Sequence, residues 1–296
     1  MKTFILTLLS LTSLPATIYA GISEKNLTQC INLPIQYNKL NIPTTHLLIN
    51  GKSIEFVIDL GKKQALTLDK ELAESLTSDT YNIHTVAQTD LTGEQSNVQT
   101  GTIPTVILNG MLFQNINFDL YSPWGLWMNT RAEDNNLPNN TIGRDLFMNE
   151  KGILYYSRKN KNLHWCKAEK PDFEQHSKNI IWMPLEEDQE GIHITTEHKD
   201  KVLNFVLDSA ATVSLIKPYT WVNFKDNDLY PDTKDLVYID DLNIKNNPIT
   251  TLAYKYSFPE NFTSDGLMGD SFFQQTDLII DTVNNKVGLV FLQTEQ

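Results

Sequence analysis

The chain is a succession of short runs of β-branched and other apolar residues, separated by clusters of Asn, Gly, Asp and Pro. Runs of this length that are bounded by turn residues are typical of β-strands. The clearest cover residues 46–50, 55–59, 105–108 and 278–281. Helical periodicity is convincing only over 69–76, where Asp69 can cap the first turn, and over a shorter segment at 218–224. The pattern therefore predicts an all-β protein with a few short helices.

Both halves of the chain carry the same order of segments. In the first half, the sequence Phe-Val-Ile-Asp ending at Asp59 is followed by Leu66 and then by the expected helix at 69–76. In the second half, Phe-Val-Leu-Asp ending at Asp208 is followed at the same distance by Leu215 and by the second expected helix. An internal repeat is a strong indication of architecture. It predicts two similarly folded lobes related by a pseudo-twofold axis.

A second block is also duplicated, and it sets the expected lobe boundaries. Residues 142–163 run in step with 268–289 without a gap, and both begin with an apolar residue followed by glycine. The polar stretch 167–179 lies between the two copies and has the composition of a linker. We therefore expect an N-terminal lobe over 21–166, a linker over 167–179 and a C-terminal lobe over 180–296.

The first twenty residues have the layout of a secretory signal peptide. Lys2 is followed by an apolar run from Phe4 to Leu14 and by small residues around Ala16 and Ala20. The run is too short to cross a bilayer, and no later segment has the ~20 apolar residues that a spanning helix needs. A buried N-terminal helix is the alternative, which Lys2 and the small-residue exit fit less well. The prediction is a secreted or periplasmic protein without a membrane span.

Charge and histidine usage exclude two classes of function. The chain has 24 basic and 36 acidic residues, a formal net charge of −12, and no Lys/Arg stripe that could neutralise phosphates. Nucleic-acid binding is therefore not expected. The six histidines are scattered, and no spacing typical of metal ligands occurs. We expect neither a metal site nor a cofactor.

Two cysteines, Cys30 and Cys166, are the complete set. One pair is the pattern of a single optional cross-link, not of a disulfide scaffold. The sequence leaves open whether this pair forms a bridge.

The duplicated strands suggest a specific chemistry. Each ends in an aspartate, Asp59 or Asp208, and is followed by a turn made largely of small residues. A pseudo-twofold axis between the copies would bring the two carboxyl groups together. At about 3 Å they could not both ionise, so the pair would hold one proton from acid to neutral pH. Such a pair can act as base and acid on a shared water, and it titrates as a unit.

Two segments of the second half carry a family resemblance. Residues 205–216, FVLDSAATVSLI, closely resemble the active-site strand and turn of aspartic proteases, whose pattern is Asp-Thr/Ser-Gly-Ala/Thr-Ser/Thr. Residues 265–273, DGLMGDSFF, are similar to the closing segment of a pepsin-type lobe. With the duplicated blocks of the first half, the resemblance covers nearly all of the chain after residue 20. It implies the two-lobed fold of pepsin-like and retropepsin-like aspartic proteases.

The resemblance also implies roles for individual residues. Asp59 and Asp208 would be the catalytic dyad of an endopeptidase, and the turns would be supported by Gly61, Ser209 and Thr212. An extended peptide or protein substrate would lie between the lobes. No cofactor would be needed, and a monomer would suffice because one chain supplies both half-sites.

The family has a hairpin flap that closes over the substrate from lobe one only. Extra sequence in the first half, 85–99, fits this element, and Thr92 and Gly93 would form its turn. Three further aspartates are expected to have structural roles. Asp281 resembles the family's structural strand residue, not a third catalytic acid, and Asp145 and Asp270 are expected to cap helices.

Two departures from the family pattern support an alternative function. Leu60 stands where the family has Thr or Ser, whose hydroxyl binds across to the other lobe, and Ala210 stands where glycine is expected. The alternative is a catalytically inactive relative that binds a peptide or protein in the same cleft. A third interpretation, an unrelated β protein whose aspartates only end strands, would have to explain the matched duplication.

Overall fold

The computed structural model describes residues 29–77, 83–89, 93–122, 138–167, 180–221 and 235–292. The expected signal peptide at 1–20 and Thr92 of the expected flap lie outside the described residues. So does nearly all of the expected linker, which leaves the lobe boundaries at 166 and 180 a prediction. Within the described residues, no helix is long and apolar enough to cross a membrane.

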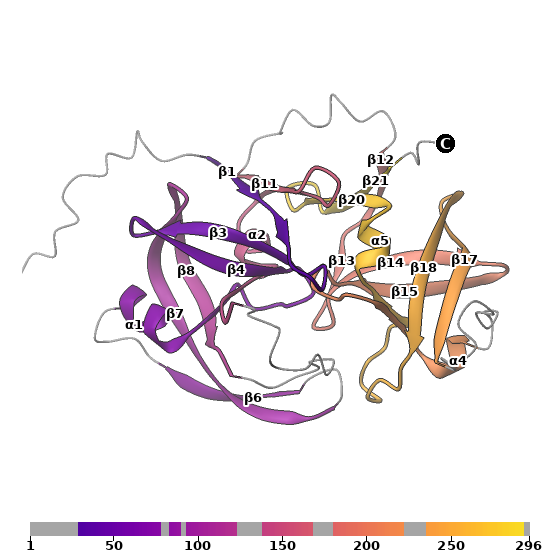
Figure 1. Cartoon of the computed structure of the whole chain (residues 1–296), viewed down its shortest axis with the longest axis horizontal. Coiled ribbons are helices and arrows are strands. Elements are labelled where there is room, and N and C mark those ends of the chain that lie inside the picture. The colour runs from indigo at the N-terminus through magenta and orange to yellow at the C-terminus, as the bar shows by residue number, and fades with distance from the viewer. Residues whose placement is uncertain are drawn as a thin grey trace, which may run out of the picture.

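Lobe one is formed by an eight-stranded sheet from the first half of the chain (Figure 1). The sheet curls back on itself, because Ile49 of β3 also pairs with Leu108 of β7. Helix α1 (Lys70–Leu76) and the single turn α2 (Asp145–Met148) belong to this half. The strand order is β2 (Gln36–Tyr37), β3 (Pro43–Ile49), β4 (Lys52–Asp59), β9 (Thr141–Gly143), β5 (Leu66–Leu68), β8 (Met111–Leu120), β7 (Gln95–Leu108) and β6 (His84–Thr89).

Lobe two is formed by a seven-stranded sheet from the second half, and it also curls, because Glu197 of β14 pairs with Asn243 of β17. Its helices are α4 (Pro218–Trp221) and α5 (Asp270–Phe273). The strand order is β13 (Glu186–Glu187), β14 (Ile192–His198), β15 (Lys201–Leu207), β19 (Gly266–Met268), β16 (Ser214–Ile216), β18 (Asn247–Lys255) and β17 (Leu236–Ile244). The predicted all-β, two-lobed fold is therefore confirmed.

A third sheet joins the lobes, and the sequence did not predict it. Strands from the two halves meet at β10 and β20, where Tyr156 lies opposite Leu278. Across this junction the Tyr155 hydroxyl donates to Asp277 at 2.6 Å. The sheet spans both halves of the molecule at one side of the lobes (Figure 1). Its order is β1 (Cys30–Pro34), β11 (Asn162–Lys167), β10 (Gly152–Ser157), β20 (Thr276–Asp281), β21 (Lys286–Phe291) and β12 (Ile180–Pro184).

Local sequence explains how these strands form. Strands β3 and β14 have the same alternation of buried and exposed residues over most of their length, as expected where one face covers the core. Two hairpins of lobe one turn at Asn50-Gly51 and Asn109-Gly110, and all four residues have positive φ. Two-residue hairpin loops of this type favour Asn-Gly, because both central residues need the left-handed region. The turns therefore set the register of β3 with β4 and of β7 with β8.

The helix predictions had mixed outcomes. Asp69 caps α1 as predicted, since its carboxylate accepts from the Leu72 amide at 2.8 Å. The segment expected at 218–224 is helical over Pro218–Trp221, and its remaining residues lie outside the described ones. The prediction that Asp145 and Asp270 cap helices was wrong. Both lie one residue too late, inside the first turn, and neither helix has a side-chain cap.

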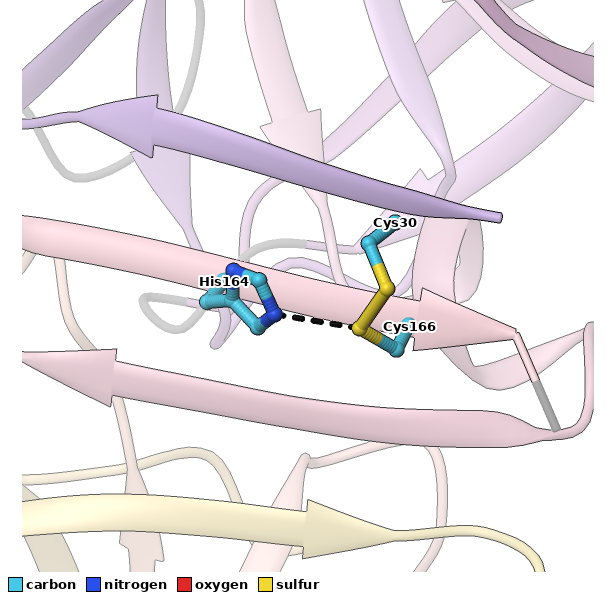
Figure 2. Close-up of a disulfide and its surroundings, with 3 residues drawn as sticks. All are labelled: Cys30, His164 and Cys166. Atoms are coloured by element: carbon cyan, nitrogen blue, oxygen red, sulfur yellow. Dashed lines mark hydrogen bonds between the residues drawn. A yellow bond between two sulfur atoms is a disulfide. The ribbon is translucent and has the colours of Figure 1, made fainter. Parts of the chain in front are cut away.

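The open question about the cysteines is decided in favour of a bridge. Cys30 and Cys166 lie directly opposite each other on the paired strands β1 and β11 and form a disulfide (Figure 2). The bridge ties the first described strand to the end of β11, 136 residues later in the sequence. It therefore restricts a large part of the unfolded chain.

We predict that the double variant Cys30→Ser, Cys166→Ser unfolds more easily. The free energy of unfolding should fall by about 2–5 kcal/mol, because the unfolded chain regains the freedom that the bridge removes. Denaturant unfolding at one pH measures this difference. The wild-type protein in a thiol reductant should unfold at the same midpoint as the double variant, and equal stability of the oxidised wild type and the variant would contradict the prediction.

Candidate active site

The two repeated aspartates end equivalent strands. Asp59 is the last residue of β4, and Asp208 directly follows β15. Each strand runs parallel to the short strand of its lobe's second block: Asp59 pairs with Gly143 of β9, and the Asp208 amide donates to Met268 of β19 at 3.0 Å. A central parallel pair of strands thus aims each carboxyl-bearing turn out of its lobe.

Glycines behind the turns allow this arrangement. A Cβ atom at Gly143 would lie 1.9 Å from the carbonyl oxygen of Gln64, and one at Gly269 would lie 2.5 Å from that of Val213. Neither glycine has a positive φ, so the requirement is for space and not for an unusual backbone conformation. The turn backbones pack directly on these two positions, which explains why both repeats carry a glycine there.

The turns meet across the lobe boundary. A Cβ atom at Gly61 would lie 2.7 Å from Cγ of Asp208, so the first turn touches the second carboxyl group. The side chains of Asp59 and Asp208 are also joined by a hydrogen bond. The structure therefore brings together the two aspartates that the sequence predicted to be paired.

Backbone amides of the turns hold both carboxyl groups. The Lys62 amide donates to Oδ1 of Asp59 at 2.9 Å. The amides of Ala210 and Ala211 donate to Oδ1 of Asp208 at 2.9 and 3.1 Å. Each aspartate is half-buried, so each remains accessible from the solvent side. The pair is thus oriented by its own turns and can still meet a water or a ligand.

Ser209 ties the second turn to the first lobe. Its hydroxyl accepts from the Leu60 amide at 2.9 Å and donates to the Ile58 carbonyl at 3.1 Å. Leu60 has no hydroxyl with which to make the reciprocal contacts, and its side chain is fully buried in the core of lobe one. The hydroxyl tie between the turns is therefore made from one side only.

Two other residues belong to the second turn: Ala210, whose backbone conformation the sequence left open, and Thr212, which was predicted to support the turn. Ala210 does not have a positive φ, so its Cβ atom adds no backbone strain where the family has glycine. Thr212 lies half-buried after the turn. Among the contacts of the described residues, its side chain makes no hydrogen bond to either aspartate.

The two carboxyl groups differ in acidity. Burial raises the pKa of Asp208 to about 8, and the neighbouring charge of Asp59 adds to this rise. Burial also raises the pKa of Asp59, but the Lys62 charge, the Lys62 amide and the hydrogen bond to Asp208 oppose it. Asp59 therefore ionises first, and the pair keeps one proton, held mainly by Asp208, up to mildly basic pH.

Sequence reasoning missed one charged residue of the site, Arg144. Its side chain is fully buried, and its Nη1 donates to the carbonyl oxygen of Gly61 at 2.6 Å. Its charge also lowers the pKa of Asp59. A usable signal was present, because Arg144 directly follows the repeated glycine and lies between apolar residues on both sides of the Arg144-Asp145 pair, and a buried charge needs partners.

The hairpin predicted as a flap is formed by β6 and β7, at the lower edge of lobe one in Figure 1. A Cβ atom at Gly93, near its tip, would lie 3.4 Å from Cβ of Pro259 in lobe two. On β6, Gln88 donates to the buried Asp119 at 3.0 Å, and Gln64 donates to the same carboxylate at 2.9 Å. The hairpin is thus linked both to the opposite lobe and to the loop that follows Asp59.

One group of potential metal ligands occurs among the described residues. The donor atoms of Cys30, His164 and Cys166 lie within 4.8 Å of one another, far from the aspartates in sequence. The two sulfurs are joined in the disulfide, and Nε2 of His164 lies 3.0 Å from Sγ of Cys166 (Figure 2). Cysteine binds metals as the thiolate, which the bridged cysteines do not offer.

We predict that the equivalent positions 61 and 210 respond differently to an exchange between glycine and alanine. The Gly61→Ala variant should lose stability, because the new Cβ atom would press on Asp208. The Ala210→Gly variant removes a Cβ atom that causes no strain and should cost at most about 1 kcal/mol. Thermal unfolding of both variants beside the wild type measures this difference. Equal tolerance at the two positions would contradict the described contact.

Comparison with known proteins supports the two-lobed fold. No family model and no curated protein matches the sequence. Several solved structures match the fold: an aspartic proteinase from Irpex lacteus (TM-score 0.58, 11% identity, covering 89% of this chain and 98% of that one), basic 7S globulin from soybean (0.55, 10%, 88% and 95%) and conglutin gamma from lupine seeds (0.55, 10%, 88% and 95%). The chain therefore has the two-lobed fold that it shares with this aspartic proteinase and these globulins.

Proposed function

We propose that the protein is an aspartic endopeptidase that hydrolyses peptide bonds with a water activated by Asp59 and Asp208. The observation that carries this proposal is the hydrogen-bonded pair of half-buried aspartates, held by turn amides at the boundary between the lobes. A pair with one shared proton provides a base and an acid at the same place. The substrate would be an extended peptide or an unfolded protein segment lying between the lobes.

In the proposed reaction, the ionised Asp59 removes a proton from water while the water oxygen attacks the peptide carbonyl. Asp208 donates its proton to the carbonyl oxygen, which gives a neutral tetrahedral intermediate. Asp59 then delivers its proton to the amide nitrogen, the C–N bond breaks, and Asp208 regains a proton from a hydroxyl of the intermediate. The assignment of roles follows from the pKa order, because Asp208 keeps its proton when Asp59 has lost one.

The proposal also includes the residues that support the two turns, the flap, the export of the protein and its oligomeric state. Gly61, Ser209 and Thr212 would support the two turns. Thr92 and Gly93 would form the tip of a flap over the substrate. Residues 1–20 would direct export to the periplasm or the medium, an oxidising location in which the Cys30 to Cys166 bridge is stable. The chain would act as a monomer because it contributes both aspartates.

A second function has one specific observation in its favour. The buried Leu60 removes half of the hydroxyl contacts between the turns, which a relative that only binds peptides would not need. Two of the structures with this fold are also named as globulins. This alternative keeps the interlobe cleft and the bound peptide but omits the cleavage step.

Substitution of either aspartate separates the two functions. We predict that Asp59→Asn and Asp208→Asn each lower the cleavage rate of unfolded casein by at least about 10²-fold, since each removes a proton-transfer group. The Asp200→Asn variant, changed at an exposed turn between β14 and β15, is the control and should cleave normally. Pepstatin should inhibit the wild type. Cleavage that survives both substitutions would refute the dyad, and an inactive wild type that still binds peptides would favour the alternative.

The pH profile should depend on Lys62. The active pair carries one proton, so activity should fall when Asp59 becomes protonated at low pH and when Asp208 ionises near pH 8. Replacement of Lys62 by Met removes the charge that most lowers the pKa of Asp59, so the acid limb should move to higher pH. The basic limb should stay in place.

Lys63, the exposed residue next to Lys62, provides the control for this pH measurement. The exposed Lys63 is not among the groups that mainly shift the pKa of Asp59, so the Lys63→Met variant should reproduce the wild-type profile. The quantity to measure is kcat as a function of pH for all three proteins. An acid limb that is identical in the two lysine variants would show that the Lys62 charge does not act on the pair.

A further inference from the structure

Among the described residues, only the Ser209 hydroxyl of lobe two links the two active-site turns through a side-chain hydroxyl. Ser209 binds the backbone on both sides of Asp59, but the first turn contributes no hydroxyl in return, because position 60 is Leu. Gly61 packs directly on Asp208, so the loop over 60–62 lies against lobe two. The shared six-stranded sheet sets how the lobes sit, and a contact at the turn itself would hold this loop locally.

Arg144 makes contacts of the required kind. Its Nη1 donates to the carbonyl oxygen of Gly61 at 2.6 Å, within the first turn. Its Nε donates to Glu187 at 2.9 Å and its Nη2 to the Asp188 carbonyl at 2.6 Å, both in the β13–β14 hairpin of lobe two. The backbone amide of Arg144 also donates to the Lys62 carbonyl at 2.9 Å. One residue thus holds the first turn twice and reaches the opposite lobe twice.

The environment of Arg144 makes these bonds strong. The side chain has no exposed surface, whereas Glu187 is 27% exposed at its side chain. Charge-assisted hydrogen bonds are stronger than neutral ones, and a planar guanidinium fixes the direction of each. A buried cation that loses one partner has no water to replace it. The Arg144 guanidinium is therefore held in one position, and its hydrogen bond fixes the carbonyl of Gly61 relative to it.

The equivalent residue of lobe two makes a similar contact with reversed charge. Asp270 follows Gly269 as Arg144 follows Gly143, and its carboxylate binds Arg158 of lobe one through both oxygens. Its backbone amide donates to the Ala211 carbonyl behind the second turn at 2.8 Å. The side chains of this second ion pair do not contact either turn. It therefore provides a natural control for the first.

We propose that Arg144 is a positioning residue that holds the turn of Asp59 against lobe two, in place of the hydroxyl that position 60 lacks. The proposal rests on the proposed function, because it assigns a role in aligning the same pair of aspartates. Its geometric part, that Arg144 fixes the first turn, holds whether or not the protein cleaves peptides.

The charges around Asp59 are consistent with this role. Lys62 from its own turn, Arg144 from the segment between β9 and α2, and Asp208 from lobe two face the Asp59 carboxyl group. Arg144 is itself faced by Glu187 and by the Asp188 carbonyl. Arg144 thus acts on Asp59 both through the backbone of the turn and through its charge.

The test compares Arg144→Lys with Arg158→Lys. Each variant keeps a positive charge and loses the planar fork of one interlobe ion pair, but only Arg144 contacts the first turn. Two properties are measured on the full chain: hydrogen exchange at the amides of Leu60 and Lys62, and kcat with KM for unfolded casein. We expect Arg144→Lys to speed exchange at both amides and to lower kcat by about 10²-fold with little change in KM. Arg158→Lys should change neither.

The outcomes separate this proposal from the proposed function. Similar exchange and similar kcat in the two variants would overturn the role of Arg144 while leaving the protease assignment intact. An inactive wild type would refute the proposed function, and the exchange measurement would still decide the positioning role. If Arg144→Lys does not fold, Glu187→Gln provides the same comparison, because it leaves Arg144 with neutral partners only and should speed exchange at the same amides.

Discussion

The contact between Gly61 and Asp208 is the constraint on which the rest of the structure depends. It allows no side chain at position 61 and requires the two lobes to keep one relative position. The six-stranded sheet provides that position, because strands from both halves pair at β10 and β20. The glycines behind each turn extend the same packing into the lobes. The repeated sequence block and the shared sheet therefore together bring the two turns into contact.

The duplication has been retained in the backbone and has diverged in the side chains. The turns carry Leu60 opposite Ser209 and Gly61 opposite Ala210, and the residue after the second glycine is Arg144 in one lobe and Asp270 in the other. Contacts across the lobe boundary remain in spite of two of these differences. Ser209 makes both hydroxyl bonds, and the two charged residues each form an interlobe ion pair of opposite polarity.

Divergence between the two halves also gives the two carboxyl groups different surroundings and therefore different pKa values. Two identical turns related by exact symmetry would give them the same surroundings. Asp59 lies beside Lys62 and near Arg144, whereas Asp208 is surrounded by neutral turn amides and by the charge of Asp59. The proton therefore has a preferred place before any ligand arrives. A proteolytic mechanism uses this inequality directly, and a protein that only binds peptides would have no need of it.

The sequence by itself determined the strand-rich fold class, the duplication and the pairing of Asp59 with Asp208. The fold class follows from local patterns, since short apolar runs and turn residues involve neighbouring positions, whereas the duplication and the expected pairing follow from comparing the two halves of the chain. Two misplaced helix caps, at Asp145 and Asp270, are errors of one residue in such local patterns. Only the tertiary structure decided the disulfide, the shared six-stranded sheet, the absence of strain at Ala210 and the burial of Arg144 between the lobes. Each of these depends on a distance or a backbone angle set by residues far apart in the chain, which no local pattern records.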